Sequence, residues 1–168
     1  LGKPNQAQSE SIAQIITSFM IYGDRDNKKL SYILATAWHE SKLLLVKEKR
    51  GTPGSALYQL QEKYWNTGFY GRGFVQLTHR ENYIKLGKIL NIDLVNNPDL
   101  ALDRRYASDI INIGMMQGLF TGVSLHNYIS FSHADYFNAR KVVNGTDRAQ
   151  LIADYTTKII NNLEYQIV

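Results

Sequence analysis

The chain has 168 residues and a mass of 19.2 kDa, and its 44% hydrophobic and 20% charged residues exclude a disordered or fibrous protein and predict one domain over residues 1–168. The absence of cysteine excludes a disulfide framework, a thiol nucleophile and a thiolate metal site. The net charge of +4 favours an anionic polymer as the partner, but the basic residues are spread along the chain, so nucleic acid is not expected.

Two helices are predicted in the first quarter of the chain, over residues 8–22 and 28–42. The second is so apolar that much of its circumference is expected to be covered by protein. In the turn between them, Asp24 and Asp26 have the spacing of two calcium ligands. The glycine and the closing glutamate of a calcium loop are missing, so a turn with a helix cap is predicted instead.

Glycine, proline and aromatic residues make the segment 49–70 an irregular loop, and a loop of that length inside a domain is often functional. The segment 70–78 is predicted to be a tight turn followed by a short extended stretch. No apolar run is long enough for a membrane span. Further helices are predicted over 80–90, 103–119, 134–143 and 147–164. The predicted fold is therefore mostly helical, with a small extended element near its middle.

The sequence lacks the residues that several other kinds of functional site require. The Gly71-x-Gly73 sequence has no third glycine and no following lysine, so it is not a phosphate loop. The four histidines have no metal-ligand spacing, and His39-Glu40 is not followed by the second histidine of a zinc-protease helix. No metal and no cofactor is expected.

Glu40 is the first candidate for chemistry, because it lies near the end of the apolar helix, beside Trp38. Burial there would raise its pKa and make it a proton donor near neutral pH, although a surface glutamate at a helix end is the simpler interpretation. A second carboxylate is available in Glu48 or Glu62. On a continuous helix Glu48 would lie roughly 12 Å of rise beyond Glu40. Since inverting glycosidases hold their carboxyls about 6.5–9.5 Å apart, the helix is expected to end near Leu43 or Leu44 and the chain to fold back and present Glu48.

Four strings of residues occur in a specific order: His39-Glu40-Ser41, Tyr70-Gly71-Arg72-Gly73-Phe74-Val75-Gln76-Leu77-Thr78, Asn82-Tyr83 and Val143-Asn144-Gly145. Together they resemble glycoside hydrolase family 19, which comprises chitinases and the peptidoglycan-degrading endolysins of phages and bacteria. The resemblance covers roughly residues 30 to 150. It implies a mostly helical, lysozyme-like α+β fold with its extended element beside the active-site cleft.

The resemblance also implies a role for each matching residue. Glu40 matches the general acid, and Glu48 matches the general base better than Glu62 does. Thr78 matches the residue that helps to hold the attacking water. The side chains implied in substrate binding or in the cleft wall are His39, Tyr70, Arg72, Gln76, Asn82 and Asn144. Arg72 is expected to steady a carboxylate, and Trp65, Phe69 and Tyr70 offer apolar faces either to sugar rings or to the packing of the loop.

The activity implied is inverting hydrolysis of β-1,4 bonds in polymers of N-acetylated amino sugars, without metal or cofactor. Because the chain is basic and free of cysteine, peptidoglycan is the first expected substrate, cut by a monomeric phage endolysin or wall-remodelling enzyme. Such an enzyme would act at the cell wall, in the periplasm or outside the cell, without entering a membrane. The alternatives are a chitinase on the same fold and a non-catalytic glycan-binding domain.

Overall fold

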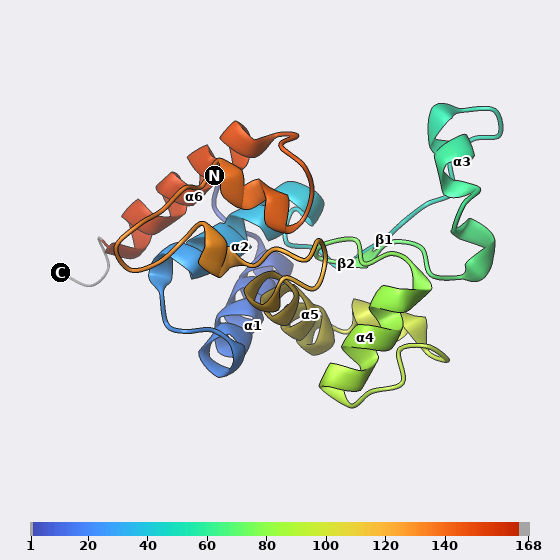
Figure 1. Ribbon diagram of the computed structural model, residues 1–168, viewed down its shortest axis with the longest axis horizontal. Coiled ribbons are helices and arrows are strands. Elements are labelled where there is room, and N and C mark those ends of the chain that lie inside the picture. Colours follow the sequence, from blue (N-terminus) through green and yellow to red (C-terminus); the bar gives the residue numbers. More distant parts are fainter. Residues whose placement is uncertain (1, 165–168) are drawn as a thin grey trace.

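The computed structural model describes residues 2–164 and shows a chain made mostly of helices (Figure 1). In chain order, the α-helices and strands are α1 (Gln6–Tyr22), α2 (Asn27–Ser41), β1 (Val46–Lys47), α3 (Ala56–Gln61), β2 (Arg72–Gly73), α4 (Arg80–Leu90), α5 (Arg104–Gln117) and α6 (Ala149–Glu164). Between them lie the 3₁₀ helices η1 (Trp65–Thr67), η2 (Pro98–Leu102), η3 (Leu125–Asn127) and η4 (Asn138–Val142). The prediction of a mostly helical fold with a small extended element is confirmed.

Four helices form what we call the helical body: α1, α2, α5 and α6. Helix α2 packs against α6, and α1 packs against α5. All residues of α2 from 29 to 37 are buried, as the apolar sequence predicts. Ile33 of α2 and Ile111 of α5 are completely buried in the core. The residues of α2 are therefore held on all sides by neighbouring helices, and its last turn has a fixed position.

The two ends of α2 follow from local chemistry. Asp26 caps its first turn, since the Asp26 Oδ1 accepts a hydrogen bond from Lys28 N at 2.9 Å. Asp24, the other acidic residue of the turn, forms an ion pair with Lys29. At the other end Lys42 and Leu43 have positive φ angles of 55° and 59°, and the helix stops at Ser41. The predicted cap and the predicted helix end are both confirmed.

Residues 49–70 form what we call the arm, which projects away from the helical body (Figure 1, right). Its root is a two-stranded antiparallel sheet in which Val46 pairs with Gly73 and Lys47 with Arg72. The prediction of an irregular loop is wrong in part, because the arm contains α3 and η1. The Ser55 Oγ caps α3 by accepting a hydrogen bond from Tyr58 N at 3.1 Å.

The remaining predicted boundaries differ little from the structure. Helix α4 has the predicted bounds, α5 covers most of 103–119, and α6 begins at Ala149 rather than at 147. The helix predicted over 134–143 is shorter and is the 3₁₀ helix η4. Over residues 2–164, no helix combines the length and the apolar character needed to cross a membrane.

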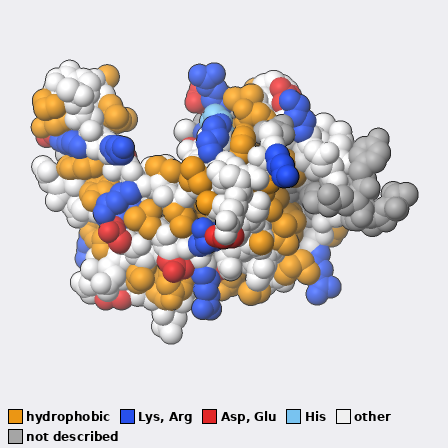
Figure 2. Space-filling view, turned by 180° about the vertical axis from the view of Figure 1, so that it is seen from behind, with side chains coloured by type: hydrophobic (Ala, Val, Ile, Leu, Met, Phe, Trp, Pro, Cys, Tyr) orange, Lys and Arg blue, Asp and Glu red, His pale blue; other side chains and the backbone are white. Residues whose placement is uncertain are grey.

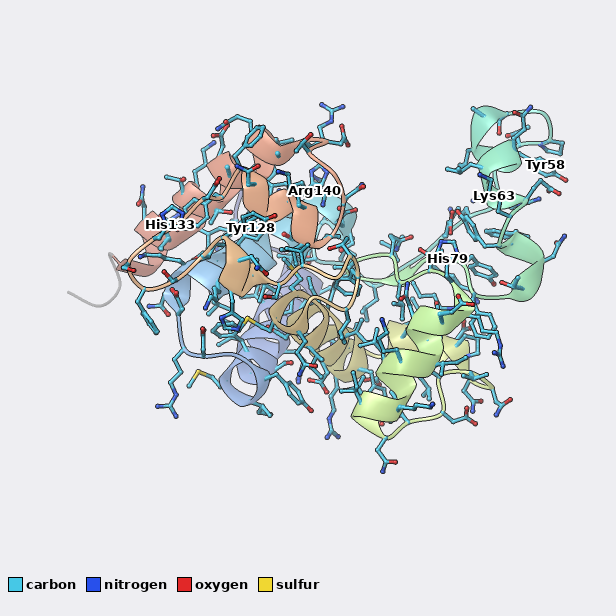
Figure 3. All side chains as sticks on the ribbon, in the orientation of Figure 1. Tyr58, Lys63, His79, Tyr128, His133 and Arg140 are labelled. Carbon is cyan, nitrogen blue, oxygen red and sulfur yellow. The ribbon has the colours of Figure 1, made fainter. Side chains whose placement is uncertain are left out.

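The arm and the helical body leave a hollow between them. Figure 2, seen from behind, shows this hollow at the surface, with the arm as the raised part at its left. In Figure 3, Arg140 lies on the side of the helical body, whereas Tyr58, Lys63 and His79 lie on the side of the arm and of α4. The predicted site residues are distributed over these two sides.

Candidate active site

Glu40 lies in the last turn of α2, where the helix leaves the core. Its side chain is 21% exposed and its Oε1 atom forms an ion pair with Arg140 Nη1 at 2.6 Å. No other protein partner contacts the Glu40 carboxylate among the residues that the structure describes. The Oε2 atom is therefore free to meet a ligand.

Arg140 is a site residue that sequence reasoning did not select. It lies on η4, only 3% of its side chain is exposed, and its Nε donates to the Asp147 carbonyl at 3.0 Å. A charge-assisted hydrogen bond of this kind fixes both partners, so Arg140 fixes the direction of the Glu40 carboxylate. The pair joins positions 100 residues apart. The only signal in the sequence is a lone arginine shortly before Val143-Asn144-Gly145.

His39 precedes Glu40 and is half-buried at the same helix end. Burial lowers the pKa of its imidazole, and the charges of Arg140 and Lys42 act in the same direction, while Glu40 opposes them. His39 is accordingly neutral at pH 7, with one ring nitrogen able to donate and the other to accept. Its role in substrate binding stays a prediction.

Glu48 follows β1 directly and receives three hydrogen bonds. Its Oε1 accepts from Gln61 Nε2 at 2.8 Å and from the Tyr64 hydroxyl at 2.7 Å. Its Oε2 accepts from the backbone N–H of Gly71 at 2.7 Å. Gln61 and Tyr64 belong to the arm, and Gly71 belongs to the returning strand segment. The sequence did not indicate these donors.

The charge state of Glu48 follows from these contacts. Burial alone would raise the pKa of the Glu48 carboxyl, but the hydrogen bonds from Gln61, Gly71 and Tyr64 and the charge of Arg50 outweigh it, so the pKa is lowered. Glu48 is thus ionised at neutral pH, which is the state that a general base requires.

Glu62, the competing candidate, has a different environment. Its side chain is exposed and forms an ion pair with Arg50 on the arm. No backbone N–H or neutral side chain is directed at it among the described residues. The geometry therefore supports Glu48 over Glu62 as the second carboxylate.

The side chains after Gly71 mainly hold the backbone. Gln76, at a positive φ of 51°, donates through Nε2 to the carbonyls of Val46 at 3.0 Å and Gly73 at 3.3 Å. This contact joins the strand that precedes Glu48 to the turn that contains Gln76. A Cβ atom at Gly71 would lie 2.5 Å from Gln76 Oε1 and 3.2 Å from Glu48 Oε2. The Gln76 and Glu48 side chains thus both lie close to the glycine, and Gln76 has only an acceptor oxygen left for a ligand.

Thr78 and Asn82 continue this arrangement. Thr78 Oγ1 donates to the Gln76 carbonyl at 2.9 Å, and Asn82 Nδ2 donates to the Thr78 carbonyl at 2.8 Å. Both side chains are half-buried. The predicted contact of Thr78 with water would use its hydroxyl oxygen as an acceptor, and that of Asn82 with sugar would use its amide oxygen and its second N–H.

Arg72 and Tyr70 contact each other, and neither is among the hydrogen-bond donors of Glu48 in the described part of the chain. Arg72 Nε pairs with Asp99 at 2.6 Å, and Arg72 Nη1 donates to the carbonyls of Gly68 at 2.9 Å and Tyr70 at 3.0 Å. Arg72 does steady a carboxylate, but that carboxylate is Asp99 and neither of the predicted catalytic glutamates. Its contacts with two carbonyls hold the returning end of the arm.

The aromatic residues of the arm pack mainly against protein. Trp65 and Tyr70 stack with ring centroids 4.3 Å apart, and the Arg72 guanidinium lies 4.2 Å from the Tyr70 ring. Phe69 is buried against Tyr83. For Phe69 and Tyr70 the structure favours packing of the arm over an open platform for sugar rings.

Asn144 is exposed in the turn between η4 and α6, and its Oδ1 accepts the Gly145 N–H at 2.8 Å. Its side-chain NH₂ group has no partner among the described residues. Its role in sugar binding stays a prediction.

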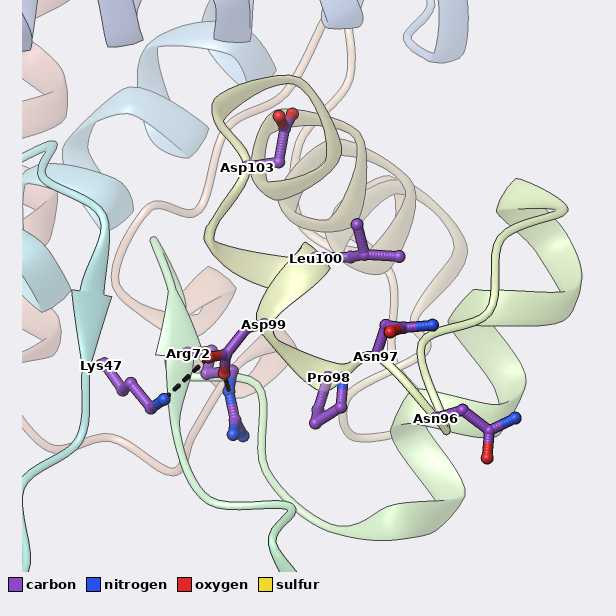
Figure 4. A pocket seen from close by; sticks show the side chains of 8 residues that line it. All are labelled: Lys47, Arg72, Asn96, Asn97, Pro98, Asp99, Leu100 and Asp103. Atoms are coloured by element: carbon purple, nitrogen blue, oxygen red, sulfur yellow. Dashed lines mark hydrogen bonds and ion pairs between the residues drawn. The ribbon is translucent and has the colours of Figure 1, made fainter.

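A second hollow, of about 570 Å³, lies outside the region of the two glutamates (Figure 4). Asp99 is at its edge and pairs with both Lys47, at 2.9 Å, and Arg72. Its lining residues are Lys47, Arg72, Asn96, Asn97, Pro98, Asp99, Leu100 and Asp103. Within residues 2–164, no group of three or more histidine or acidic side chains is placed to hold a metal ion.

Comparison with known families finds one match over most of the chain. The family model described as chitinase class I, that of glycoside hydrolase family 19, matches residues 14–118. The matched part includes Glu40, Glu48 and Thr78. It ends before Asn144, although the resemblance was expected to extend to about residue 150.

Among curated proteins, chitinase 11 of Oryza sativa subsp. japonica is 62% identical over 32 residues, which are 19% of this chain and 12% of that protein. The basic endochitinase of Vitis vinifera is 39% identical over 56 residues, which are 31% of this chain and 17% of that protein. The chain thus matches less than a fifth of the length of these relatives.

Among solved structures, chitinase C from Streptomyces griseus HUT6037 superposes with a TM-score of 0.67 at 16% identity, over 94% of this chain and 71% of that one. A bacterial family 19 chitinase superposes with a TM-score of 0.56 at 18% identity, over 94% of this chain and 87% of that one. At these identities the likeness shows the fold.

Proposed function

The chain belongs to glycoside hydrolase family 19, and we propose that it hydrolyses β-1,4 bonds in polymers of N-acetylated amino sugars by an inverting acid/base mechanism. The observation that carries the proposal is the contrast between two carboxylates. Glu40 keeps one oxygen without a protein partner at the end of a helix, while Glu48 is held ionised by three donors.

Because Glu40 is ion-paired with Arg140 in the structure, the proposed reaction begins when its Oε2, the oxygen without a protein partner, takes a proton from solvent. Glu40 then gives this proton to the glycosidic oxygen as the bond from the anomeric carbon to that oxygen breaks. A water molecule attacks the anomeric carbon from the opposite face, and Glu48 takes its proton. Glu40 ends ionised and Glu48 ends protonated, and exchange with solvent restores both.

Arg140 has two roles in this scheme. It directs the Glu40 carboxylate, and its positive charge stabilises the negative charge that remains on Glu40 after the proton has left. Thr78 would help to hold the attacking water by accepting a hydrogen bond from it, and the half-buried amide of Asn82 would contact the sugar.

Chitin is the first proposed substrate, because the curated relatives and the solved structures reported above carry the name chitinase. Peptidoglycan is the second candidate, and the net charge of +4 favours it, since an anionic wall attracts a basic protein. On either substrate the enzyme would act at a cell wall or outside the cell.

The test is digestion of purified chitin oligosaccharides and, separately, of purified peptidoglycan, with the anomeric form of fresh products read by NMR. We expect cleavage with α-anomers as the first products. Initial β-anomers would overturn the inverting mechanism. Binding of both polymers without cleavage would overturn the activity in favour of a non-catalytic glycan-binding domain.

A further inference from the structure

We propose that Gln61 and Tyr64, two side chains carried by the arm, are the positioning residues of the general base Glu48. The inference rests on the proposed function, since it concerns how that base is held. Both residues donate to the same carboxylate oxygen, Oε1, at 2.8 Å and 2.7 Å.

The hydrogen bonds to Glu48 leave one of its lone-pair positions open. An ionised carboxylate offers about four lone-pair positions to hydrogen-bond donors. Gln61 and Tyr64 occupy two on Oε1, and the Gly71 N–H occupies one on Oε2. One position on Oε2 remains, so this atom is where the water proton is accepted. Gly71 keeps that oxygen accessible, because a Cβ there would lie 3.2 Å from it.

Gln61 is itself fixed in one orientation. Its side chain is completely buried, and its Nε2 donates to the Lys49 carbonyl at 2.9 Å as well as to Glu48. Its Oε1 accepts the Gly51 N–H at 2.7 Å. Both N–H groups of the amide and one lone pair of its oxygen are therefore satisfied, and a flipped amide would place its NH₂ group against the Gly51 N–H. Gln61, the last residue of α3, thus connects Lys49 and Gly51 at the root of the arm to the base.

The groups around Glu48 also favour its ionised form. Burial and the hydrogen bond to Glu48 raise the pKa of the Tyr64 phenol to about 12, so Tyr64 remains a donor at neutral pH. Arg50 contributes positive charge, while its own partner is Glu62. His79 lies behind Tyr64 with its ring 5.4 Å away in an edge contact.

The experiment uses Tyr64→Phe and Gln61→Leu in the full chain. Tyr64→Phe removes one hydroxyl and keeps the ring, so it tests the idea even where Gln61→Leu loosens the arm. Gln59→Leu is the matched control, because Gln59 is exposed on α3 and makes no contact with Glu48. Two measurements are made: the pH dependence of kcat/KM on a chitin oligosaccharide, and the titration midpoint of the Glu48 carboxyl carbon by ¹³C NMR.

Each hydrogen bond to the ionised form lowers the pKa of Glu48, so its loss raises the midpoint. We expect the acidic limb of the pH profile and the NMR midpoint to move up by about one unit in both variants. We also expect kcat to fall about ten-fold with KM within about two-fold, and Gln59→Leu to match the wild type.

Unchanged midpoints in both variants, or an equal shift in Gln59→Leu, would overturn the inference. A wild-type protein that cleaves neither polymer would overturn the proposed function instead. The NMR midpoints would then still decide whether the arm holds Glu48, because they require no turnover.

Discussion

The helical body and the arm each hold one carboxylate, and they hold it differently. Glu40 lies on a helix whose preceding turns are buried on all sides, and one distant arginine sets its direction. Glu48 lies at the root of a projecting segment, and its partners come from that segment. The acid depends on the packing of the core, whereas the base depends on a small hydrogen-bond network.

The same contrast is visible in stability. Ile33 on α2 is completely buried, whereas Leu57 and Leu60 on α3 are largely exposed. Phe69 is the one buried apolar side chain of the arm, residues 49–70, so hydrogen bonds such as those of Gln61 carry much of the order in the rest of it. Substitutions can therefore address one side of the site at a time.

The largest effect is expected for Glu40→Gln, which removes the proposed proton donor and keeps the shape of the side chain. kcat is expected to fall by about 10²–10⁴-fold with binding of oligosaccharide retained. The control is Glu10→Gln, which breaks an exposed ion pair with Arg104 and is expected to leave kcat unchanged. Wild-type turnover in Glu40→Gln would show that Glu40 is not the general acid, and the helical body would then hold no catalytic carboxylate in this scheme.

Substitution of Glu48 and of Glu62 tests which of the two glutamates on the side of the arm is the general base. Glu48→Gln is expected to lower kcat by about 10²–10³-fold, because a neutral amide cannot take the proton of water. Glu62→Gln removes an exposed charge and is expected to stay within about two-fold of the wild type. Steady-state rates on one oligosaccharide are sufficient. The reverse order of effects would assign the base to Glu62.

A pair of apolar truncations separates the regions by stability. Ile33→Ala creates a cavity in the core and is expected to lower the free energy of unfolding by about 2–5 kcal/mol. Leu60→Ala, at a side chain 56% exposed, is expected to change it by about 0.5 kcal/mol or less. Urea unfolding followed by circular dichroism measures both. Equal losses would mean that the arm shares the core of the helical body.

The smallest of the expected effects is that at Asp109, a carboxylate of the helical body that has fewer hydrogen-bond donors than Glu48. Burial raises the pKa of Asp109 on α5, an effect that the Ser18 hydroxyl and Arg105 only partly offset. The folded protein therefore binds the Asp109 proton more tightly than the unfolded chain does. Stability from that proton is present at low pH and is lost as pH rises through the raised pKa.

Asp109→Asn keeps the neutral shape at every pH. It is expected to raise the Tm at pH 7 by at most a few degrees, since about 1 kcal/mol corresponds to about 2–4 °C for a chain of this size. The gain should shrink as pH approaches the ordinary aspartate range near 3.8. Thermal unfolding at several pH values measures it, and a gain that grows toward low pH would contradict the assignment.

The sequence was sufficient for features that local chemistry decides. The apolar run of α2 and a cap in the turn before it could be read directly, because each depends on neighbouring residues. The position of Glu40 at the helix end followed from the same pattern. The end of that helix before Glu48 was expected instead from the spacing that two catalytic carboxylates require.

Features that depend on distant partners could not be read. Nothing near Arg140 indicates that its guanidinium meets Glu40, since the pairing depends on how η4 packs against α2. Helix α3 has only six residues after a glycine- and proline-containing stretch, too short for a periodic signal. Gln61 at its end is recognisable only once the arm has folded back onto Glu48.

The hydrogen bond from Glu48 N to the Gly71 carbonyl, at 2.8 Å, closes the arm at its root. The two ends of the arm are therefore neighbours, and its ring–ring contacts with the rest of the protein, Tyr64 with His79 and Phe69 with Tyr83, lie on the side of α4. Such a segment can be lengthened, shortened or exchanged for another as a cassette without altering the path of the helices. The requirement on any replacement is chemical: it must return two donors to Glu48.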